Sequence, residues 1–193
     1  MLIVQYFLII FFLFVMFFFL FRSLIIVQTM LMGVPFLPSN KAFKKALDYL
    51  EIEKGSKVLD IGSGDGRVLI YASKKYPETS FIGIERNLLL VIYSNILKTI
   101  LLRKNLKFKL GNIYDFDISE FDRIYMYLTP DFIDKVLIKK GDEIREGCKI
   151  ISFYFSMGFK FPKYNNISEY IVKYRGKEID IFKWEKNGNI RWK

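Results

Sequence analysis

Residues 58–67 read VLDIGSGDGR, and this stretch constrains the fold of the chain more than any other. A buried strand leads into a glycine-rich turn that opens a helix, and such a turn directs free backbone N–H groups at a ligand. A dinucleotide-binding loop would place its third glycine at position 67, where this chain has Arg67. No Gly-Lys-Ser/Thr follows, which excludes a P-loop. Asp60, two residues before the first glycine, suits a ligand with a cationic amino-acid end.

Strand-like and helical patterns alternate on both sides of this turn. Strands are expected at 57–61, 80–84, 106–110, 123–127 and 149–155, and helices at 41–50 (capped by Ser39 or Asn40), 67–76, 88–102 and 131–145. Residues 169–174 and 178–184 flank Arg175-Gly176-Lys177 and predict an antiparallel hairpin. The expected fold is therefore α/β: a Rossmann-like, doubly wound sheet of seven strands, mostly parallel, with a C-terminal antiparallel hairpin.

Glu85 ends the second predicted strand, 19 residues after Gly66. An acid at about this distance, at the tip of the second strand, accepts hydrogen bonds from both hydroxyls of a ribose. Taken alone, Glu85 could equally be a surface carboxylate. The glycine turn and the spacing together favour the ribose interpretation.

The N-terminal 21 residues are apolar apart from Gln5 and contain no charged side chain. About 20 such residues in a helix cross a hydrocarbon core about 30 Å thick. We therefore expect a transmembrane anchor at 1–22, an interfacial or linker segment at 23–40 and one domain at 41–193. A cleaved signal peptide fits less well, because no Lys or Arg precedes the run and no small-residue cleavage site follows it. The basic residues Arg22, Lys41, Lys44 and Lys45 follow the span, which predicts a single-pass membrane protein with a cytoplasmic domain.

The chain is basic, with 30 Lys and Arg against 20 Asp and Glu and a formal charge of +10. These basic residues are scattered along the domain, which favours solvated faces and an anionic lipid bilayer as the partner over nucleic acid. We therefore expect no nucleic-acid partner.

Histidine is absent and cysteine occurs once, as Cys148. The lack of histidine argues against catalytic triads and most zinc sites, so no metal site is expected. A single cysteine excludes an internal disulfide and, at the head of an apolar run, predicts a buried thiol.

The pattern from Lys57 through Phe155 resembles the class I S-adenosylmethionine (SAM)-dependent methyltransferases. The resemblance implies that SAM is the cofactor and that 41–193 is a methyltransferase domain. It also implies that Asp60 and the backbone of Gly62 and Gly64 hold the methionine end, while Glu85 binds the ribose. The full set of cofactor contacts that it implies is Asp60, Gly62, Ser63, Gly64, Asp65, Gly66, Glu85, Asn112 and Ile113, with Asn112 near the adenine amine. For Asp65, capping of the following helix is the plainer alternative.

A narrower resemblance rests on four segments: Pro35-Phe36-Leu37-Pro38-Ser39, the GSGDGR turn, Tyr127-Leu128-Thr129-Pro130 and Ile151-Ser152-Phe153. With the N-terminal apolar run, they are similar to the membrane-anchored ATP synthase c-subunit lysine N-methyltransferase family and its prokaryotic relatives. The chain departs from that family after Glu85, where Arg86-Asn87-Leu88 stands in place of Asn-Pro-Trp. This departure leaves the ribose acid intact but changes its neighbourhood.

The resemblance implies a protein-lysine N-methyltransferase that acts on a small membrane protein. A lysine acceptor needs only to lose its proton in an apolar channel, so neither histidine nor metal is required. Tyr127, Thr129 and Pro130 are the candidate catalytic residues, with Phe36 and Pro38 as further channel candidates; ordinary packing is the alternative for each. A lipid or small-molecule methyltransferase and a non-catalytic SAM-binding scaffold are the alternative functions.

Overall fold

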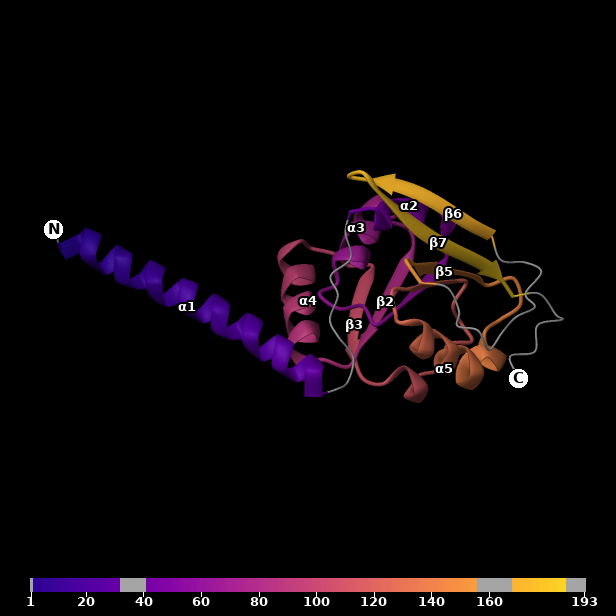
Figure 1. Cartoon of the computed structure of the whole chain (residues 1–193), viewed down its shortest axis with the longest axis horizontal. Coiled ribbons are helices and arrows are strands. Elements are labelled where there is room, and N and C mark those ends of the chain that lie inside the picture. Colours follow the sequence, from indigo (N-terminus) through magenta and orange to yellow (C-terminus); the bar gives the residue numbers. More distant parts are fainter. Residues whose placement is uncertain (1, 32–40, 156–167, 187–193) are drawn as a thin grey trace. The chain divides into compact units, whose positions relative to one another are not determined.

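The centre of the molecule is a sheet of seven strands in the order β3-β2-β1-β4-β5-β7-β6 (Figure 1). A computed structural model describes residues 2–31, 41–155 and 168–186 of the chain. The strands are β1 (Lys57–Ile61), β2 (Ser80–Glu85), β3 (Leu106–Leu110), β4 (Arg123–Met126), β5 (Lys149–Phe153), β6 (Ser168–Tyr174) and β7 (Lys177–Glu185). Strands β1 to β5 are parallel, and β7 runs antiparallel to both β5 and β6. The predicted seven-stranded class is confirmed.

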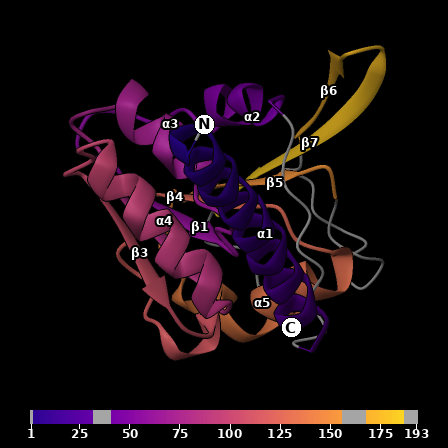
Figure 2. The same ribbon diagram turned by 90° about the vertical axis from the view of Figure 1, so that its left-hand side faces the viewer.

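Helices cover both faces of this sheet. The helical elements are α2 (Phe43–Tyr49), α3 (Arg67–Lys75), α4 (Leu88–Ile100), α5 (Pro130–Lys140) and the short 3₁₀ turns η1 (Ile113–Asp115) and η2 (Gly141–Glu143). Helices α2, α3 and α4 contribute to one hydrophobic core with Val58, Phe81 and Tyr125. Helix α5 packs in a second core with Leu59 and Ile124, on the opposite face (Figure 2). Successive side chains of β1 and β4 point to opposite faces of the sheet, so each of these strands contributes to both cores.

The β6–β7 hairpin closes through Arg175 and Gly176, which have φ angles of 51° and 76°. Two consecutive residues with positive φ form the turn whose twist matches that of two antiparallel strands, and glycine at the second position favours it. The sequence Arg-Gly between two β-rich runs thus places an antiparallel pair at the far edge of an otherwise parallel sheet.

Three predicted elements end two or more residues earlier than expected, and a backbone feature marks each end. Strand β5 stops at Phe153 because Tyr154 has a φ of 78°, which turns the chain out of the sheet. Helix α4 stops at Ile100, and Leu102 follows with a φ of 53°. Helix α5 stops at Lys140, where the 3₁₀ turn η2 begins. The proposed caps Ser39 and Asn40 lie outside the described residues.

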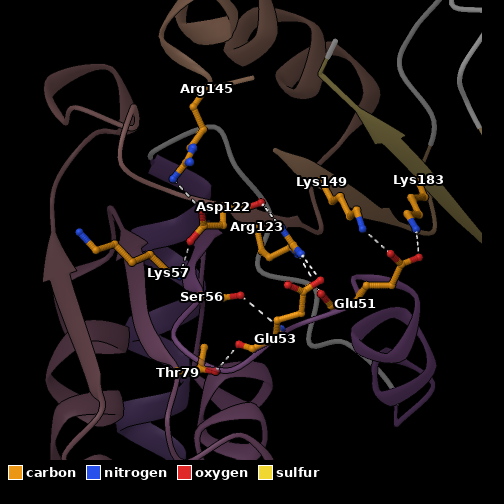
Figure 3. Close-up of polar contacts among 10 residues, drawn as sticks. All are labelled: Glu51, Glu53, Ser56, Lys57, Thr79, Asp122, Arg123, Arg145, Lys149 and Lys183. Carbon is orange, nitrogen blue, oxygen red and sulfur yellow. Dashed lines mark hydrogen bonds and ion pairs between the residues drawn. The ribbon is translucent and has the colours of Figure 1, made fainter. Parts of the chain in front are cut away.

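The amino ends of the parallel strands carry a network of paired charges (Figure 3). Glu51 accepts hydrogen bonds from Lys149 at the start of β5 and from Lys183 on β7. Arg123, the first residue of β4, donates to the Glu51 carbonyl at 2.9 Å. Asp122 accepts from the Lys57 backbone N–H at 2.8 Å and from Arg145 at 2.7 Å. The loop before β1 is therefore tied to the starts of β1, β4 and β5.

The N-terminal unit, Met1–Leu37, contains the helix α1 (Leu2–Leu31). Residues Leu2–Gln28 are long and apolar enough to cross a membrane, a property that signal sequences share. The helix continues past Arg22 without interruption through the first part of the predicted 23–40 segment. The proposed division of the chain at 22 and 40 stays a prediction.

Candidate active site

The strand order reverses between β1 and β4, and ligands of open α/β sheets bind at the carboxyl edge of such a point. Here the turn from β1 to α3 has positive φ at Gly62 (76°), Gly64 (55°) and Gly66 (76°). The N–H groups of Gly62 and Ser63 donate to the Ile84 carbonyl at 2.9 and 3.1 Å, which fixes the turn against β2. The turn is thus held by its neighbours in a backbone conformation that favours glycine.

Close contacts add a second requirement for glycine in this turn. A Cβ atom on Gly66 would lie 2.5 Å from the Phe108 ring and 2.9 Å from Ser94 Oγ. Ser94, on α4, donates a hydrogen bond to the Gly64 carbonyl at 3.2 Å. Residues of α4 and β3 thus pack against one side of the turn. The other side of the turn backbone faces the carboxyl edge of the sheet.

Asp60 lies on β1 just before the turn and is 2% exposed. Burial, together with the nearby carboxylates of Glu85 and Asp65, raises the pKa of Asp60 well above its ordinary value. The carboxylates of Glu85 and Asp65 thus disfavour the charged form of Asp60. A cation bound beside them would relieve that repulsion, so the cluster suits a positively charged ligand group.

Glu85 ends β2 beside the glycine turn, as its spacing predicted. One of its carboxylate oxygens accepts the Gly64 N–H at 2.9 Å. The other accepts the N–H groups of Arg86 and Asn87 at 2.8 and 2.9 Å. These bonds hold the carboxylate at the tip of the strand. Each carboxylate oxygen can accept about two hydrogen bonds, so the oxygen that accepts the Gly64 N–H can accept one more.

The residues directly after Glu85 have a structural role. Asn87 accepts hydrogen bonds from the N–H groups of Leu89 and Leu90 at 2.9 and 3.2 Å, and it therefore caps α4. Asn87 is 1% exposed. Asn87 thus starts the helix that supports the turn.

Asp65 and Ser63 differ in how their side chains are used. Asp65 accepts from the backbone N–H of Arg67 at 3.2 Å and forms an ion pair with the Arg67 guanidinium. These contacts form a local turn before α3, whose N-cap residue is Gly66 and has no side-chain capping bond. Ser63 is buried, and its Oγ has no hydrogen-bond partner in the part of the chain that the structure describes.

Asn112 and Ile113 follow β3 on the same edge of the sheet. The Asn112 side-chain oxygen accepts the Tyr114 N–H at 3.4 Å and starts η1. Ile113 is 3% exposed and packs in the second hydrophobic core, which also contains residues of α5. Gly111 N–H donates to the Glu85 carbonyl at 2.9 Å, so this loop is tied to the strand that carries the predicted ribose acid.

Tyr127, Thr129 and Pro130 follow β4. Tyr127 packs in an aromatic cluster, with ring centroids 5.3 Å from Phe153 and 6.0 Å from Phe155. Burial raises the pKa of the Tyr127 hydroxyl. Thr129 is exposed and makes no side-chain capping bond, while Pro130 is the first residue of α5. Phe36 and Pro38, the other channel candidates, lie outside the described residues.

Sequence reasoning missed Tyr125, which pairs with Asp60 in the β1–β4 register. Its side chain is 1% exposed, and its hydroxyl has no hydrogen-bond partner among the described residues. Burial and the charge of Asp60 raise the pKa of the Tyr125 hydroxyl. In the sequence Tyr125 looks like an ordinary core residue of a strand. Its position next to Asp60 becomes visible only once β4 is paired with β1.

Comparison with known proteins decides between the classes of ligand that this edge could hold. Residues 60–163 match the model of the ANTKMT methyltransferase domain. The chain belongs to this family. A protein-lysine N-methyltransferase from Saccharolobus islandicus (strain REY15A) is 28% identical over 133 residues, which are 67% of this chain and 82% of the relative. The ATP synthase c-subunit lysine N-methyltransferase of Homo sapiens is 28% identical over 127 residues, 63% of this chain and 52% of the human protein.

The chain spans about half the length of the human relative. Solved structures show the fold independently of the family match. A crystal structure of an RNA methyltransferase from Salinibacter ruber, in complex with S-adenosyl-L-homocysteine, has a TM-score of 0.67 and 23% identity, and the match covers 80% of this chain and 97% of that one. A precorrin-6y C5,15-methyltransferase from Geobacter metallireducens GS-15 has a TM-score of 0.64 and 15% identity, and covers 78% and 90%. The chain is a SAM-dependent methyltransferase.

The residues of the carboxyl edge fit SAM. The methionine end of SAM carries an ammonium group, and Asp60 is a buried acid crowded by two further carboxylates. Gly62, Gly64 and Gly66 in the turn have no side chain, so a ligand can come close to the backbone there. Ser63 and Tyr125 add buried hydroxyls that have no partner among the described residues. The roles assigned to individual cofactor residues stay predictions.

Proposed function

We propose that this chain transfers methyl groups from SAM to the ε-amino group of a lysine in a small membrane protein. The observation that carries the proposal is the family match over residues 60–163, because the curated relatives are named protein-lysine and ATP synthase c-subunit lysine N-methyltransferases. The proposed acceptor is a lysine near the membrane surface.

Helix α1 supports the membrane part of this proposal. Its apolar stretch Leu2–Gln28 is long enough to span a bilayer, and the basic residues after Phe21 would keep the domain on the cytoplasmic side. A tether raises the local concentration of substrates in the same membrane without any new contact. A single-pass anchor would therefore favour a small membrane protein as the substrate.

The chemistry follows from the residues at the carboxyl edge. SAM supplies a methyl group on a positively charged sulfur. In our proposal Asp60 holds the ammonium group of SAM and Glu85 its ribose, which fixes the donor in one orientation. Tyr127 and Phe155, both half-buried and stacked on each other over the buried Phe153, provide an apolar surface at the ends of β4 and β5.

A lysine on that surface would lose its proton more easily, because a dry environment lowers the pKa of an ammonium group. The exposed Thr129 hydroxyl stands at the start of α5, where it could accept a hydrogen bond from the incoming amine. Pro130 fixes the backbone at this point, since its ring sets the φ of the first helical residue.

The test uses the full chain, methyl-labelled SAM and membranes from the host organism. Products are separated into protein bands and a lipid extract, and labelled protein is hydrolysed to amino acids. We expect label in one small hydrophobic protein, recovered as methylated lysine. Label in the lipid extract alone would retain the cofactor and the fold but refute the lysine substrate.

The matched control is a pair of carboxylate-to-amide variants. Glu85→Gln removes the carboxylate at the carboxyl edge, and Glu51→Gln removes one at the amino edge. We expect labelling to fall at least about 100-fold in the first variant and to stay near the parent level in the second. Alkaline carbonate extraction of the host membranes tests the anchor separately, because an integral protein stays in the membrane pellet.

A further inference from the structure

Helix α4 presents apolar side chains on both of its faces. Leu90, Val91 and Ser94 are buried on the side toward the sheet. On the other side, Leu88, Ile92, Ile96 and Ile100 are all exposed, from 44% to 68%. We call these four residues the α4 outer face. Their spacing of four places them on one stripe, about 120° wide, opposite the buried side.

The surroundings of the α4 outer face reinforce its apolar character. Thr99, the polar residue on the same side, donates its hydroxyl to the Asn95 carbonyl at 2.9 Å, so its hydrogen-bonding demand is met within the helix. Leu101 and Leu102 extend the surface beyond the helix end, and Leu102 is 79% exposed. Helices on the outside of a soluble domain normally carry charged residues there, and an exposed apolar patch marks an interaction surface.

The charge around this surface identifies the partner. Between Asn87 and Gly111 the chain has five basic residues and no acidic one. Three of them, Lys98, Arg103 and Lys104, lie at the end of α4 and in the following turn, and we call these the basic margin. Lys107 and Lys109 point from β3 to the face of the sheet opposite α4, because Leu106 and Phe108 pack on the α4 side. Figures 1 and 2 show α4 lying on the outer side of the sheet next to β3. An apolar helix face with a basic margin is the pattern that binds the surface of an anionic bilayer.

We propose that the α4 outer face and its basic margin dock on an anionic membrane surface. A second copy of the chain would bring the same positive margin against itself and is disfavoured by that repulsion. Because α1 would already hold the chain at the bilayer, even a weak interfacial affinity suffices for docking. The apolar stripe begins three residues after Glu85, so docking would keep the carboxyl edge of the sheet close to the lipid surface.

This inference rests on the proposed membrane location but not on methyl transfer. The test places a fluorescent label at Ile96→Cys in the full chain, reconstituted in vesicles of phosphatidylcholine with phosphatidylglycerol as the minor component. The native Cys148 is buried, and burial raises its pKa to about 12, so it reacts poorly with the label. The matched control is Ile171→Cys, which replaces an isoleucine that is 60% exposed on β6, at the opposite edge of the sheet.

We expect a lipid-borne quencher to quench the label at position 96 strongly and the label at 171 weakly. Equal quenching of the two labels, in vesicles that carry the chain, would overturn the proposal. So would a label at 96 that is shielded from an aqueous quencher even in detergent, because that result would mean that protein covers the face. A chain that fails to float with the vesicles would instead refute the anchor, which distinguishes the two failures.

Charge variants test the margin. Each basic residue near an anionic surface strengthens binding about fivefold. Arg103→Gln combined with Lys104→Gln should therefore shift the docking equilibrium roughly 25-fold toward the undocked state. The control, Arg175→Gln with Lys177→Gln on the β6–β7 hairpin, removes the same charge and should leave quenching at 96 unchanged. An equal loss in both pairs would contradict a localised margin.

Discussion

The two edges of the parallel sheet treat their charged residues in opposite ways. At the amino edge, Glu51 receives hydrogen bonds from Lys149 and Lys183, which lower its pKa to about 2. At the carboxyl edge, Asp60 is buried beside Glu85 and Asp65, and its pKa is raised. The first arrangement stabilises the ligand-free fold, while the second costs stability unless a cation binds. The predicted cofactor site thus contains one acid, Asp60, whose charged form the surrounding fold disfavours.

The largest expected effect comes from removing the charge of Asp60. Asp60→Asn should weaken SAM binding about 100-fold, because a buried charge-assisted contact with the ammonium group is lost. The same change should raise the free energy of unfolding of the ligand-free chain by about 1 kcal/mol, since an unfavourable buried charge is removed. Calorimetry measures the first quantity, and urea unfolding in detergent, followed by the buried Trp184, measures the second.

The pH dependence of SAM binding follows from the raised pKa of Asp60. Below about pH 7 an α-ammonium group keeps its proton. Affinity should therefore fall with decreasing pH as Asp60 becomes protonated, and the fall should begin at a higher pH than for an ordinary carboxylate. Asp60→Asn should abolish this slope. A slope that survives in the variant would assign the titration to another group.

Two glycines with similar backbone angles sharpen the comparison of the edges. Gly66 at the carboxyl edge has a φ of 76°, and Gly55 at the amino edge has a φ of 81°. A Cβ on Gly66 would lie 2.5 Å from Phe108, whereas one on Gly55 meets nothing within 4 Å. Gly66→Ala should cost about 3 kcal/mol and Gly55→Ala about 1 kcal/mol, because only the first adds a clash to the backbone strain. Equal losses in urea unfolding would show that the close approach carries no energy.

The sequence allowed the carboxyl edge to be predicted better than the amino edge. The turn, the acid before it and Glu85 are local signals at fixed spacing, and the structure brings Glu85 to within 2.9 Å of the Gly64 N–H. The Glu51 network joins residues 98 and 132 positions apart, and no local pattern announces such a contact. Element ends were least predictable, because positive φ at Tyr154 and Leu102 is not encoded by glycine.

Tyr125 tests whether the unpaired groups of the carboxyl edge serve the cofactor. Tyr125→Phe removes a buried hydroxyl without a partner among the described residues, so the free energy of unfolding should change little or rise slightly. If the hydroxyl donates to Asp60 when SAM is bound, affinity should fall about tenfold. The midpoint of the pH dependence should also move upward, because the ionised Asp60 loses a donor. A loss of stability with unchanged affinity would mean that Tyr125 only fills the core.

The smallest effect is expected at Glu51. Its carboxylate is about half exposed, so solvent screens the two ion pairs and Glu51→Gln should cost only about 1 kcal/mol at pH 7. The folded pKa of about 2 lies below the ordinary 4.5, so this stabilisation is complete above pH 4.5. It should shrink as the pH falls from 4.5 through about 2, and parent and variant should unfold with the same free energy only below that pH. SAM affinity should be the same in both chains throughout, because the paired charges of the amino edge lie at the opposite ends of the strands from the glycine turn. A change in SAM affinity would show that the charge pairs of the amino edge also influence the predicted cofactor site.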